Sequence, residues 1–402
     1  LTGFSNINTS SFDFGSGAGN AGPIRLSAPT IELHRGSIIS LSQGPGNAGN
    51  IVLGANTIMA GESSISSDTL GPGRGGDISI HGIGGPSSRA SNVMFSDGTV
   101  VSSSTSSEGR AGDIAVLTSE LSLIDSPINT STVGGGAAGN ITVDASTSVQ
   151  VSSVISPVLF IVGGSLESKS GVGPTGNAGQ ITITTPTLSV DQRGLISTST
   201  SGTGNAGNIT VNANSLNILT GGQIRSNSSI ALAPDSPPRT GAAGTVTVQG
   251  LASPAQSIQI DGTGSGIFTD TQGSGAGGGI SVSAQAVTLQ NGGQISSGST
   301  GSGPAGNINL AAGNQLTMTN SSVTTEASQS SGGLIKITTD PNGTVELSNS
   351  KISASVLDGT GGGGSVNIDP QFVILQNSQI LAQAVQGPGG NINITITNGG
   401  LF

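Results

Sequence analysis

A short pattern recurs along this chain: a Gly-rich turn, followed two residues after its last glycine by an apolar residue that we call the anchor. There are thirteen anchors, and the commonest spacing between them is 27 residues, with longer spacings where single repeats carry insertions. The anchors are Ile24, Ile51, Ile78, Ile114, Ile141, Ile181, Ile209, Val246, Ile280, Ile308, Ile335, Val366 and Ile392. A constant period of this size is typical of solenoids, in which each repeat forms one coil and stacks on the next.

The repeat at residues 204–228, GNAGNITVNANSLNILTGGQIRSNS, contains three short apolar runs separated by turn residues. Alternation at period 2 places one set of side chains on a common face: Ile209, Val211, Leu216, Ile218 and Ile224. A single coil cannot bury this face, but stacked coils hydrogen-bond at a spacing of about 4.8 Å and enclose a continuous interior. We therefore predict an all-β parallel β-helix of 13 coils, with three short strands in each coil. Residues 1–402 are expected to form one continuous β-solenoid.

Composition limits the functions that this fold could carry. The chain has 11 Lys and Arg residues and a net charge of −10, so it has no basic surface for nucleic acid. It has no Cys, which excludes disulfides and thiolate chemistry and fits an extracellular protein. No run of 18 apolar residues is present, so we expect no membrane-spanning helix. The first residues already resemble the middle of a repeat, and we expect the chain to be a segment of a longer protein.

The turn before the anchor is the first candidate for a structural site. Gly followed by Asn occupies it in five repeats, at Gly49 and Asn50, Gly139 and Asn140, Gly207 and Asn208, Gly306 and Asn307, and Gly390 and Asn391. Stacked Asn side chains could form a hydrogen-bonded ladder, or they could face solvent, and both interpretations stay open. The glycines also match a dinucleotide-binding pattern, but a strand rather than a helix follows each turn, which excludes a phosphate site.

Asp replaces Asn at this position in two successive repeats. Asp77 and Asp113 each have an arginine three residues earlier, Arg74 and Arg110. Stacked carboxylates would repel one another unless a positive charge compensates them. We predict a charge-compensated ladder of these four residues, with a bound divalent cation as the alternative.

Catalytic residues do not cluster in the repeat. Asp125, Asp191 and Asp261 each end a second run but lie in non-adjacent repeats, and only Asp97 and Asp125 are expected to be neighbours. The two histidines, His34 and His81, are predicted to be solvated. Trp and Tyr, which commonly stack on sugars, are absent. We predict no enzymatic activity, no catalytic residues, no cofactor and no metal; the alternative is a polysaccharide-active β-helix enzyme.

Surface features remain as candidates for recognition. Ser/Thr tracts such as residues 102–105 could stack into a flat hydroxyl face, which makes an ice-binding or surface-binding solenoid a further alternative. Insertions lie at residues 81–92, 152–164, 230–240 and 249–257. They are either plain surface loops or contact sites for a partner, because loops on rigid scaffolds commonly carry recognition.

The repeats at residues 204–228 and 303–328 resemble those of filamentous haemagglutinin-like exoproteins of bacterial two-partner secretion. The resemblance covers nearly the whole chain, and it implies a right-handed parallel β-helix. It also implies export through an outer-membrane secretion partner and a role as an adhesin or surface fibre. The N-terminal secretion domain of that family is not recognisable in this sequence.

We therefore expect a structural and interaction protein, secreted and associated with the cell surface. It would be an extracellular β-solenoid fibre or adhesin stalk. A parallel β-helix exposes unpaired strand edges at its two ends, which pair with further coils of the same chain or end to end with another copy. A cell-surface or matrix receptor is the expected ligand.

Overall fold

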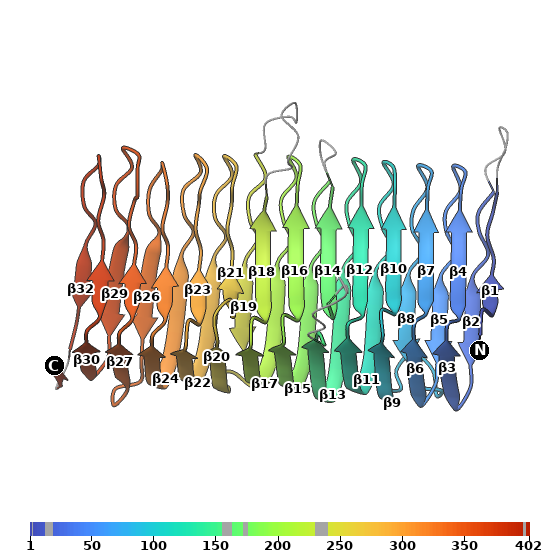
Figure 1. Ribbon diagram of the computed structural model, residues 1–402, viewed down its shortest axis with the longest axis horizontal. Helices are drawn as coiled ribbons and strands as arrows, with labels where there is room; N and C mark the ends of the chain where they lie inside the picture. The colour runs from blue at the N-terminus through green and yellow to red at the C-terminus, as the bar shows by residue number, and fades with distance from the viewer. Residues whose placement is uncertain (2, 13–18, 155–162, 172–175, 230–239, 397–398) are drawn as a thin grey trace. The chain divides into compact units, whose positions relative to one another are not determined.

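The computed structural model describes residues 1, 3–12, 19–154, 163–171, 176–229, 240–396 and 399–402, and the regular structure in these residues is entirely β (Figure 1). The chain is a parallel β-solenoid of about 13 turns with a period of about 28 residues, which confirms the fold predicted from the repeat. Its coils group into two compact units. The first comprises Leu1–Thr185 and Gly194–Gly207, and the second comprises Pro186–Arg193, Asn208–Leu232 and Pro238–Phe402.

The strands of the first unit follow the three runs of the repeat. Its first-run strands are β2 (Ile24–Ser27), β5 (Ile51–Gly54) and β8 (Ile78–His81), and its second-run strands are β3 (Thr30–His34), β6 (Thr57–Gly61) and β9 (Ala90–Ser96). Strands β11 (Ile114–Ile124), β13 (Ile141–Ser152) and β15 (Ile181–Asp191) cover both runs, and the last residues of β15 belong to the second unit. The third-run strands are β1 (Asn6–Asn8), β4 (Ser37–Ser42), β7 (Ser64–Thr69), β10 (Val100–Thr105), β12 (Pro127–Thr132), β14 (Ser165–Ser170) and β16 (Leu195–Thr200).

The second unit repeats this arrangement. Strands β17 (Ile209–Leu219), β22 (Ile280–Gln290) and β24 (Ile308–Thr319) cover the first two runs. The remaining first-run strands are β19 (Val246–Gln249), β26 (Leu334–Thr338), β29 (Ser365–Asp369) and β32 (Ile392–Ile394), and the remaining second-run strands are β20 (Ala255–Asp261), β27 (Thr344–Ser348), β30 (Phe372–Gln376) and β33 (Gly400–Leu401). The third-run strands are β18 (Gln223–Ser228), β21 (Gly266–Phe268), β23 (Gln294–Ser296), β25 (Ser322–Thr324), β28 (Lys351–Ser353) and β31 (Gln379–Leu381).

Within each unit, strands pair in parallel with the equivalent strands of the next coil. In the first unit, Ile24 pairs with Ile51, and Ile51 in turn pairs with Ile78. In the second unit, Ile280 pairs with Ile308 in the same way. Figure 1 shows the third-run strands β4, β7, β10 and β12 side by side and pointing in one direction. The anchors are therefore one column of the ladder, as their spacing in the sequence predicts.

Two of the three predicted strands are continuous in several coils. Strands β11 and β24 run through the first corner as 11 and 12 residues, with a shift of register where the chain bends. A β-bulge bends a strand without ending it, because one extra residue is left unpaired. The coil breaks into separate strands at corners that carry an insertion, as between β8 and β9 or between β19 and β20, and also at some corners without one, as between β2 and β3.

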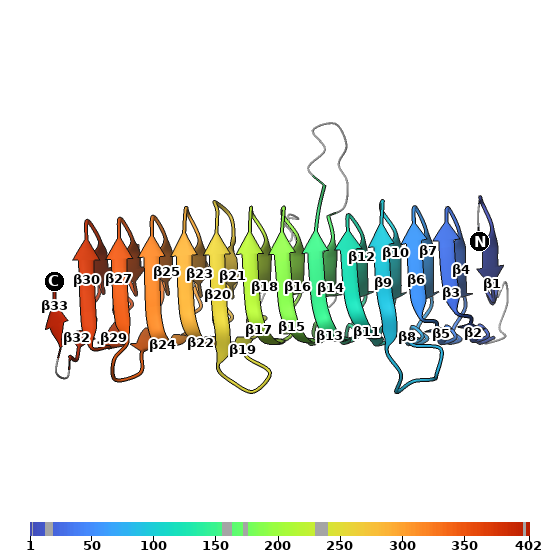
Figure 2. The same ribbon diagram turned by 90° about the horizontal axis from the view of Figure 1, so that it is seen from below.

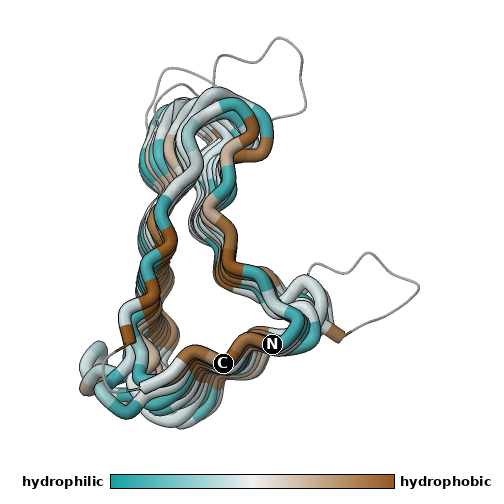
Figure 3. Tube along the Cα trace, turned by 90° about the vertical axis from the view of Figure 1, so that its left-hand side faces the viewer, coloured by the Kyte–Doolittle hydropathy of each residue, from teal (hydrophilic) through white to brown (hydrophobic). Residues whose placement is uncertain are grey.

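Apolar side chains fill the interior of each coil. Seen end on, a coil has a three-cornered part and a narrow extension, and apolar and polar positions alternate along its strands (Figure 3). The five residues predicted to share a face in residues 204–228 are all 0% exposed: Ile209, Val211, Leu216, Ile218 and Ile224. Because Ile, Val and Leu form thin stacked layers, the coil needs few aromatic residues, and Phe95 is one of its largest fully buried side chains.

Two of the four predicted insertions lie within the described residues. Figure 2 shows the loop of insertion 81–92 projecting between β8 and β9. Its Arg89 reaches along the first unit: Nη1 donates to the carbonyl oxygen of Thr118 at 3.2 Å, and Nη2 pairs with Asp144 Oδ2 at 2.9 Å. Insertion 249–257 separates β19 from β20 and exposes Leu251. Most of insertion 152–164 and nearly all of insertion 230–240 lie outside the described residues.

Candidate functional site

The glycines of the turn stand where successive coils approach most closely. A Cβ atom at Gly139 or Gly207 would overlap the carbonyl oxygen of the equivalent glycine one coil earlier, Gly112 or Gly179. The same overlap arises at Gly49, Gly306 and Gly390. Only glycine permits this backbone-to-backbone contact. The recurring Gly in the turn is thus a requirement of stacking.

Buried hydroxyl groups attach the Gly-rich turn to the third-run strand. Ser103 is 0% exposed, its Oγ donates to the carbonyl oxygen of Gly76 at 2.8 Å, and it accepts from the Gly112 N–H at 2.9 Å. In the second unit Thr269 is also 0% exposed, and it donates to the Gly278 carbonyl oxygen at 2.7 Å. The prediction of a flat hydroxyl face is therefore wrong for every second residue of the tract, because period-2 alternation turns those side chains inward.

Asn side chains before the anchor bond to the next coil. Asn50 Oδ1 accepts from the backbone N–H of Asp77 at 2.9 Å, and Asn140 Oδ1 accepts from Gln180 at 2.9 Å. In the second unit Asn208 accepts from Thr245 at 2.9 Å, and Asn307 accepts from Leu334 at 2.8 Å. Each Asn side chain therefore accepts a hydrogen bond from a backbone N–H group at a corner, where strand pairing does not provide that N–H group with an acceptor. Of the two interpretations left open by the sequence, these bonds favour the ladder.

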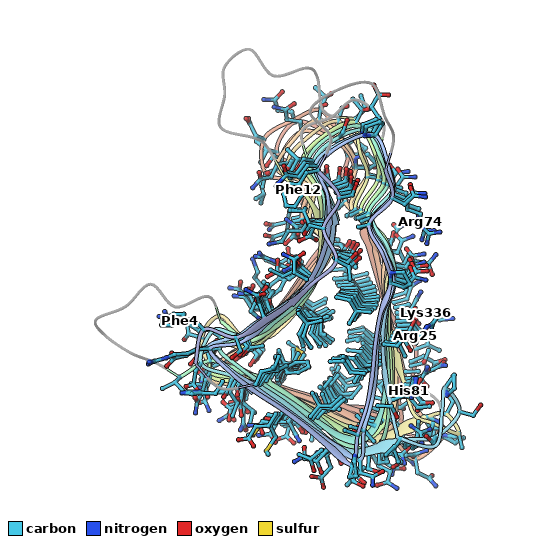
Figure 4. All side chains as sticks on the ribbon, turned by 90° about the vertical axis from the view of Figure 1, so that its right-hand side faces the viewer. Phe4, Phe12, Arg25, Arg74, His81 and Lys336 are labelled. Atoms are coloured by element: carbon cyan, nitrogen blue, oxygen red, sulfur yellow. The ribbon has the colours of Figure 1, made fainter. Side chains whose placement is uncertain are left out.

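The two aspartates occupy the same ladder. Asp77 Oδ1 accepts from the Asp113 N–H at 2.9 Å, and Asp113 Oδ1 accepts from the Asn140 N–H at 2.7 Å. Arg74 Nη2 lies 2.8 Å from Asp77 Oδ1, and Arg110 Nη2 lies 2.7 Å from Asp113 Oδ1. Arg74 points outward from the coil in Figure 4. Each carboxylate thus accepts hydrogen bonds from one arginine side chain and one backbone N–H group.

Two of the three carboxylates that end the second run, Asp125 and Asp261, accept hydrogen bonds from the next coil, whereas Asp191 Oδ1 is buried without a partner among the described residues. Asp125 Oδ1 accepts from the Val154 N–H at 2.9 Å. Burial raises the pKa of Asp125 above its ordinary value, and the neighbouring Asp97 carboxylate acts in the same direction. Asp261 accepts from the side chains of Gln290 and Asn291 at 2.8 and 2.9 Å. Among the residues that the structure describes, no group of three or more His, Cys, Asp or Glu side chains could hold a metal ion.

The prediction that both histidines are solvated is wrong for His81. His81 is 6% exposed, its Nδ1 lies 2.8 Å from the carbonyl oxygen of Gly82, and its ring packs over Gly54 of the preceding coil. Figure 4 shows its place at the end of the first run. Because Gly54 has no side chain, the His81 ring has room to pack there. The sequence does not show this, because it depends on the pairing of Gly54 with His81 in the next coil. His34 is exposed, as expected.

The left-handed backbone conformation at a second corner, between the second and third runs, was not predicted from the sequence. The residue that follows the second run has a φ between 48° and 54° in nine coils without being glycine: Arg35, Glu62, Asp97, Asp125, Thr220, Asn291, Asn320, Asn349 and Asn377. Asn and Asp tolerate this left-handed conformation better than other residues with a side chain. The recurrence of Asn or Asp directly after the second run is the signal that could have predicted it.

Two acidic side chains on the outer face of the third run, Asp68 on β7 and Asp270 just after β21, are half-buried. Burial raises the pKa of Asp68 and of Asp270 above the ordinary value of a carboxyl group. Asp68 Oδ1 accepts from the N–H and the Oγ of Ser104, both at 2.7 Å. Asp270 Oδ1 accepts from the Gly298 N–H at 2.9 Å and from Ser296 Oγ at 3.2 Å. Neither was singled out from the sequence.

No protein-family model, curated protein or solved structure matches this chain. The fold therefore rests on the repeat and on the strand register. Within the described ranges, no helix is long and apolar enough to cross a membrane. The structure defines the general class as a structural repeat protein of the β-solenoid type.

Proposed function

We propose that this protein is an extracellular β-solenoid fibre or adhesin stalk of a bacterial cell surface, of the filamentous haemagglutinin-like kind. The observation that carries the proposal is the coil-to-coil pairing of equivalent residues inside each unit, such as Ile280 with Ile308 and Ile308 with Ile335. Backbone hydrogen bonds in such a ladder run along the stacking direction. A load applied in that direction is shared by all three runs of the coil, which suits a stalk.

The composition of the site supports a mechanical role over a catalytic one. The turn residues hold the coils together. Glycines allow close backbone contact, buried hydroxyl groups bond to glycine carbonyls, and side-chain amides accept from backbone N–H groups of the next coil. Of the Asp residues that sequence analysis considered as acids or bases, Asp125 and Asp261 are engaged in hydrogen bonds to neighbouring coils. We propose that the chain is not an enzyme, and that it acts by displaying contact groups on a rigid scaffold.

The proposed partners follow from this role. Unpaired strand edges favour further coils of the same chain or end-to-end association with another copy. A cell-surface or matrix receptor would be the ligand of the stalk. Secretion through an outer-membrane partner is carried over from the resemblance of the repeats.

Immunogold electron microscopy of the bacterium that makes the protein tests the proposal. We expect label on the outside of intact cells or on released filaments, and adhesion lower in a deletion strain than in the complemented strain. Label confined to the cytoplasm would contradict it. Degradation of a polysaccharide panel by the full chain would favour the enzyme alternative instead.

A further inference from the structure

A hollow of about 260 Å³ opens on the outer face of strands β18 and β21 in the second unit. It is lined by the alternate residues that point away from the core: Gln223, Arg225, Asn227, Phe268, Asp270 and Gln272. The residues between them, such as Ile224 and Ile267, are 0% exposed and belong to the interior. The hollow is smaller than the range of about 300–1,000 Å³ that suits drug-sized ligands, so it would take one small ring.

The lining side chains form two rows on neighbouring coils. Arg225 pairs with Phe268 in the parallel register, and the Ser228 N–H donates to the carbonyl oxygen of Asp270 at 3.1 Å. Asn227 therefore stands beside Asp270, one step along the strands from Arg225 and Phe268. Because the two rows of side chains belong to hydrogen-bonded strands, strand pairing fixes the distance between the rows.

Two polar atoms of this set are buried without a partner among the described residues: Arg225 Nε and Asn227 Oδ1. The other contact of the guanidinium group is long, with Nη1 at 3.4 Å from Gln223 Oε1. A buried donor or acceptor without a hydrogen bond is unfavourable, so such atoms favour a ligand that can pair with them. One is a donor and the other an acceptor, which suits a hydroxyl group because it can be either.

Phe268 supplies an apolar surface beside these polar atoms. A Cβ atom at Gly266 would lie 2.6 Å from Phe268 Cζ, so the ring occupies the space that a side chain at position 266 would need. Glycine at this position lets the ring lie back along its own strand. The ring remains partly exposed next to Arg225. An aromatic ring with hydrogen-bonding groups at its side is a surface with one apolar and one polar part.

The charges of the hollow balance. Arg225 attracts the Asp270 carboxylate, which is also held by Ser296 and by the Gly298 N–H. One positive and one negative group stand together, so the hollow favours neither an anion nor a cation. The remaining requirement is a small neutral ring with several hydroxyl groups and one apolar face.

We propose that this hollow binds one neutral pyranose unit of a glycan, with the apolar face of the sugar against Phe268. Arg225 donates to a sugar hydroxyl, while Asn227 and Asp270 accept from neighbouring hydroxyls. This inference goes beyond the proposed stalk and does not rest on it, because the hollow would bind a sugar wherever the protein is located.

Saturation-transfer NMR with the full chain tests the inference on a panel of methyl glycosides of glucose, galactose, mannose and N-acetylglucosamine. We expect at least one glycoside to bind with millimolar affinity. Arg225→Gln and Phe268→Leu should each weaken that binding about tenfold or more. Thr324→Ala is the matched control, because Thr324 lies on the outer face of β25 outside the hollow and should leave binding unchanged.

Thermal unfolding of each variant shows whether the fold is retained, and Asn227→Ala replaces a variant that does not fold. The proposal is overturned if no glycoside of the panel binds, or if the folded hollow variants bind as well as the unchanged chain. It is also overturned if glucuronate binds more tightly than methyl glucoside, since the hollow would then select an anion.

Discussion

A side chain at Gly278 would meet the carbonyl oxygen of Gly244 in the preceding coil, whereas at Gly279 the nearest atom, Thr245 Cγ2, would be 3.6 Å from the added Cβ. These two neighbouring glycines have the same chemistry but different surroundings. The first stands in the column of close backbone contacts. The second stands at the position before the anchor, where other repeats carry Asn or Asp.

Gly278→Ala is therefore expected to destabilise the second unit by about 3 kcal/mol, because two coils must move apart to admit the methyl group. Gly279→Ala is the control and should change the free energy of unfolding by less than about 0.5 kcal/mol. Urea unfolding followed by circular dichroism measures both. Equal effects of the two substitutions would show that stacking does not require glycine.

Asp68 gives a prediction about pH. Burial raises its pKa, so the folded state binds a proton more readily than the unfolded state does. Its stability contribution is present below the unfolded pKa of about 3.9 and is lost as the pH rises through the higher folded pKa. Asp68→Asn keeps an acceptor for the Ser104 N–H and cannot ionise, so we expect it to be more stable than the unchanged chain at pH 7.

The difference between Asp68→Asn and the unchanged chain should shrink as the pH falls toward 4. Melting curves at a series of pH values measure it. Glu108→Gln, a substitution at an exposed carboxylate in the same unit, controls for the loss of one negative charge. A gain in stability that is independent of pH, or equal for both substitutions, would contradict the assignment to buried Asp68.

Sequence and structure diverge most at single residues. Glycine and Asn in the turn could be predicted because they recur in every few coils. The burial of His81 could not, because it depends on what the neighbouring coil offers, a missing side chain at Gly54. A repeat pattern describes the average coil, and it says little about a position where two particular coils meet.

The element that joins one coil to the next at the corner is the side-chain ladder. Asn307→Ala removes the acceptor of the Leu334 N–H and should cost about 1 kcal/mol. Asn307→Asp keeps an acceptor, as Asp77 and Asp113 do, and should cost less. The control is Asn309→Ala, since Asn309 is exposed on β24 two residues away. Equal loss of stability in Asn307→Ala and Asn309→Ala would exclude a role for the ladder bond.

The charged part of the ladder predicts a dependence on salt. Replacing both Arg74 and Arg110 by Ala leaves the stacked carboxylates of Asp77 and Asp113 without positive neighbours. We expect a loss of about 1 kcal/mol at low ionic strength, which shrinks at 1 M salt because exposed charges are screened. Arg25→Ala, at an exposed arginine of β2 (Figure 4), should show neither effect.

The three runs of each coil were predicted in their order, but the number and limits of the strands were not. The first two runs fuse into single strands such as β11, because a bulge carries the chain around the corner without a turn. The residues at that corner include no Gly or Pro pattern that distinguishes a continuous strand from a broken one, so the sequence does not predict whether the strand continues. Corners with an insertion, as between β19 and β20, were the ones that the sequence could place.

At the scale of the whole molecule, the period alone predicts the fold. A spacing near 27 residues places equivalent apolar residues in one column, and the observed register follows it in each unit. The hollow on β18 and β21 could not be predicted in this way. Arg225 and Phe268 are brought together across an interval lengthened by insertions, and neither residue belongs to the repeating pattern.

Disulfide cross-linking tests most directly the claim that each coil stacks in register on the next, and the absence of native Cys makes the readout clean. Cys residues at Thr317 and Glu346, which pair across β24 and β27, should lie about 4.8 Å apart between Cα atoms and oxidise to a disulfide. Cys residues at Thr317 and Ile374, two coils apart, should lie about 10 Å apart and stay reduced. Cross-linking of the first pair and not the second is the predicted result. The opposite pattern, or no cross-link in either pair, would contradict the solenoid.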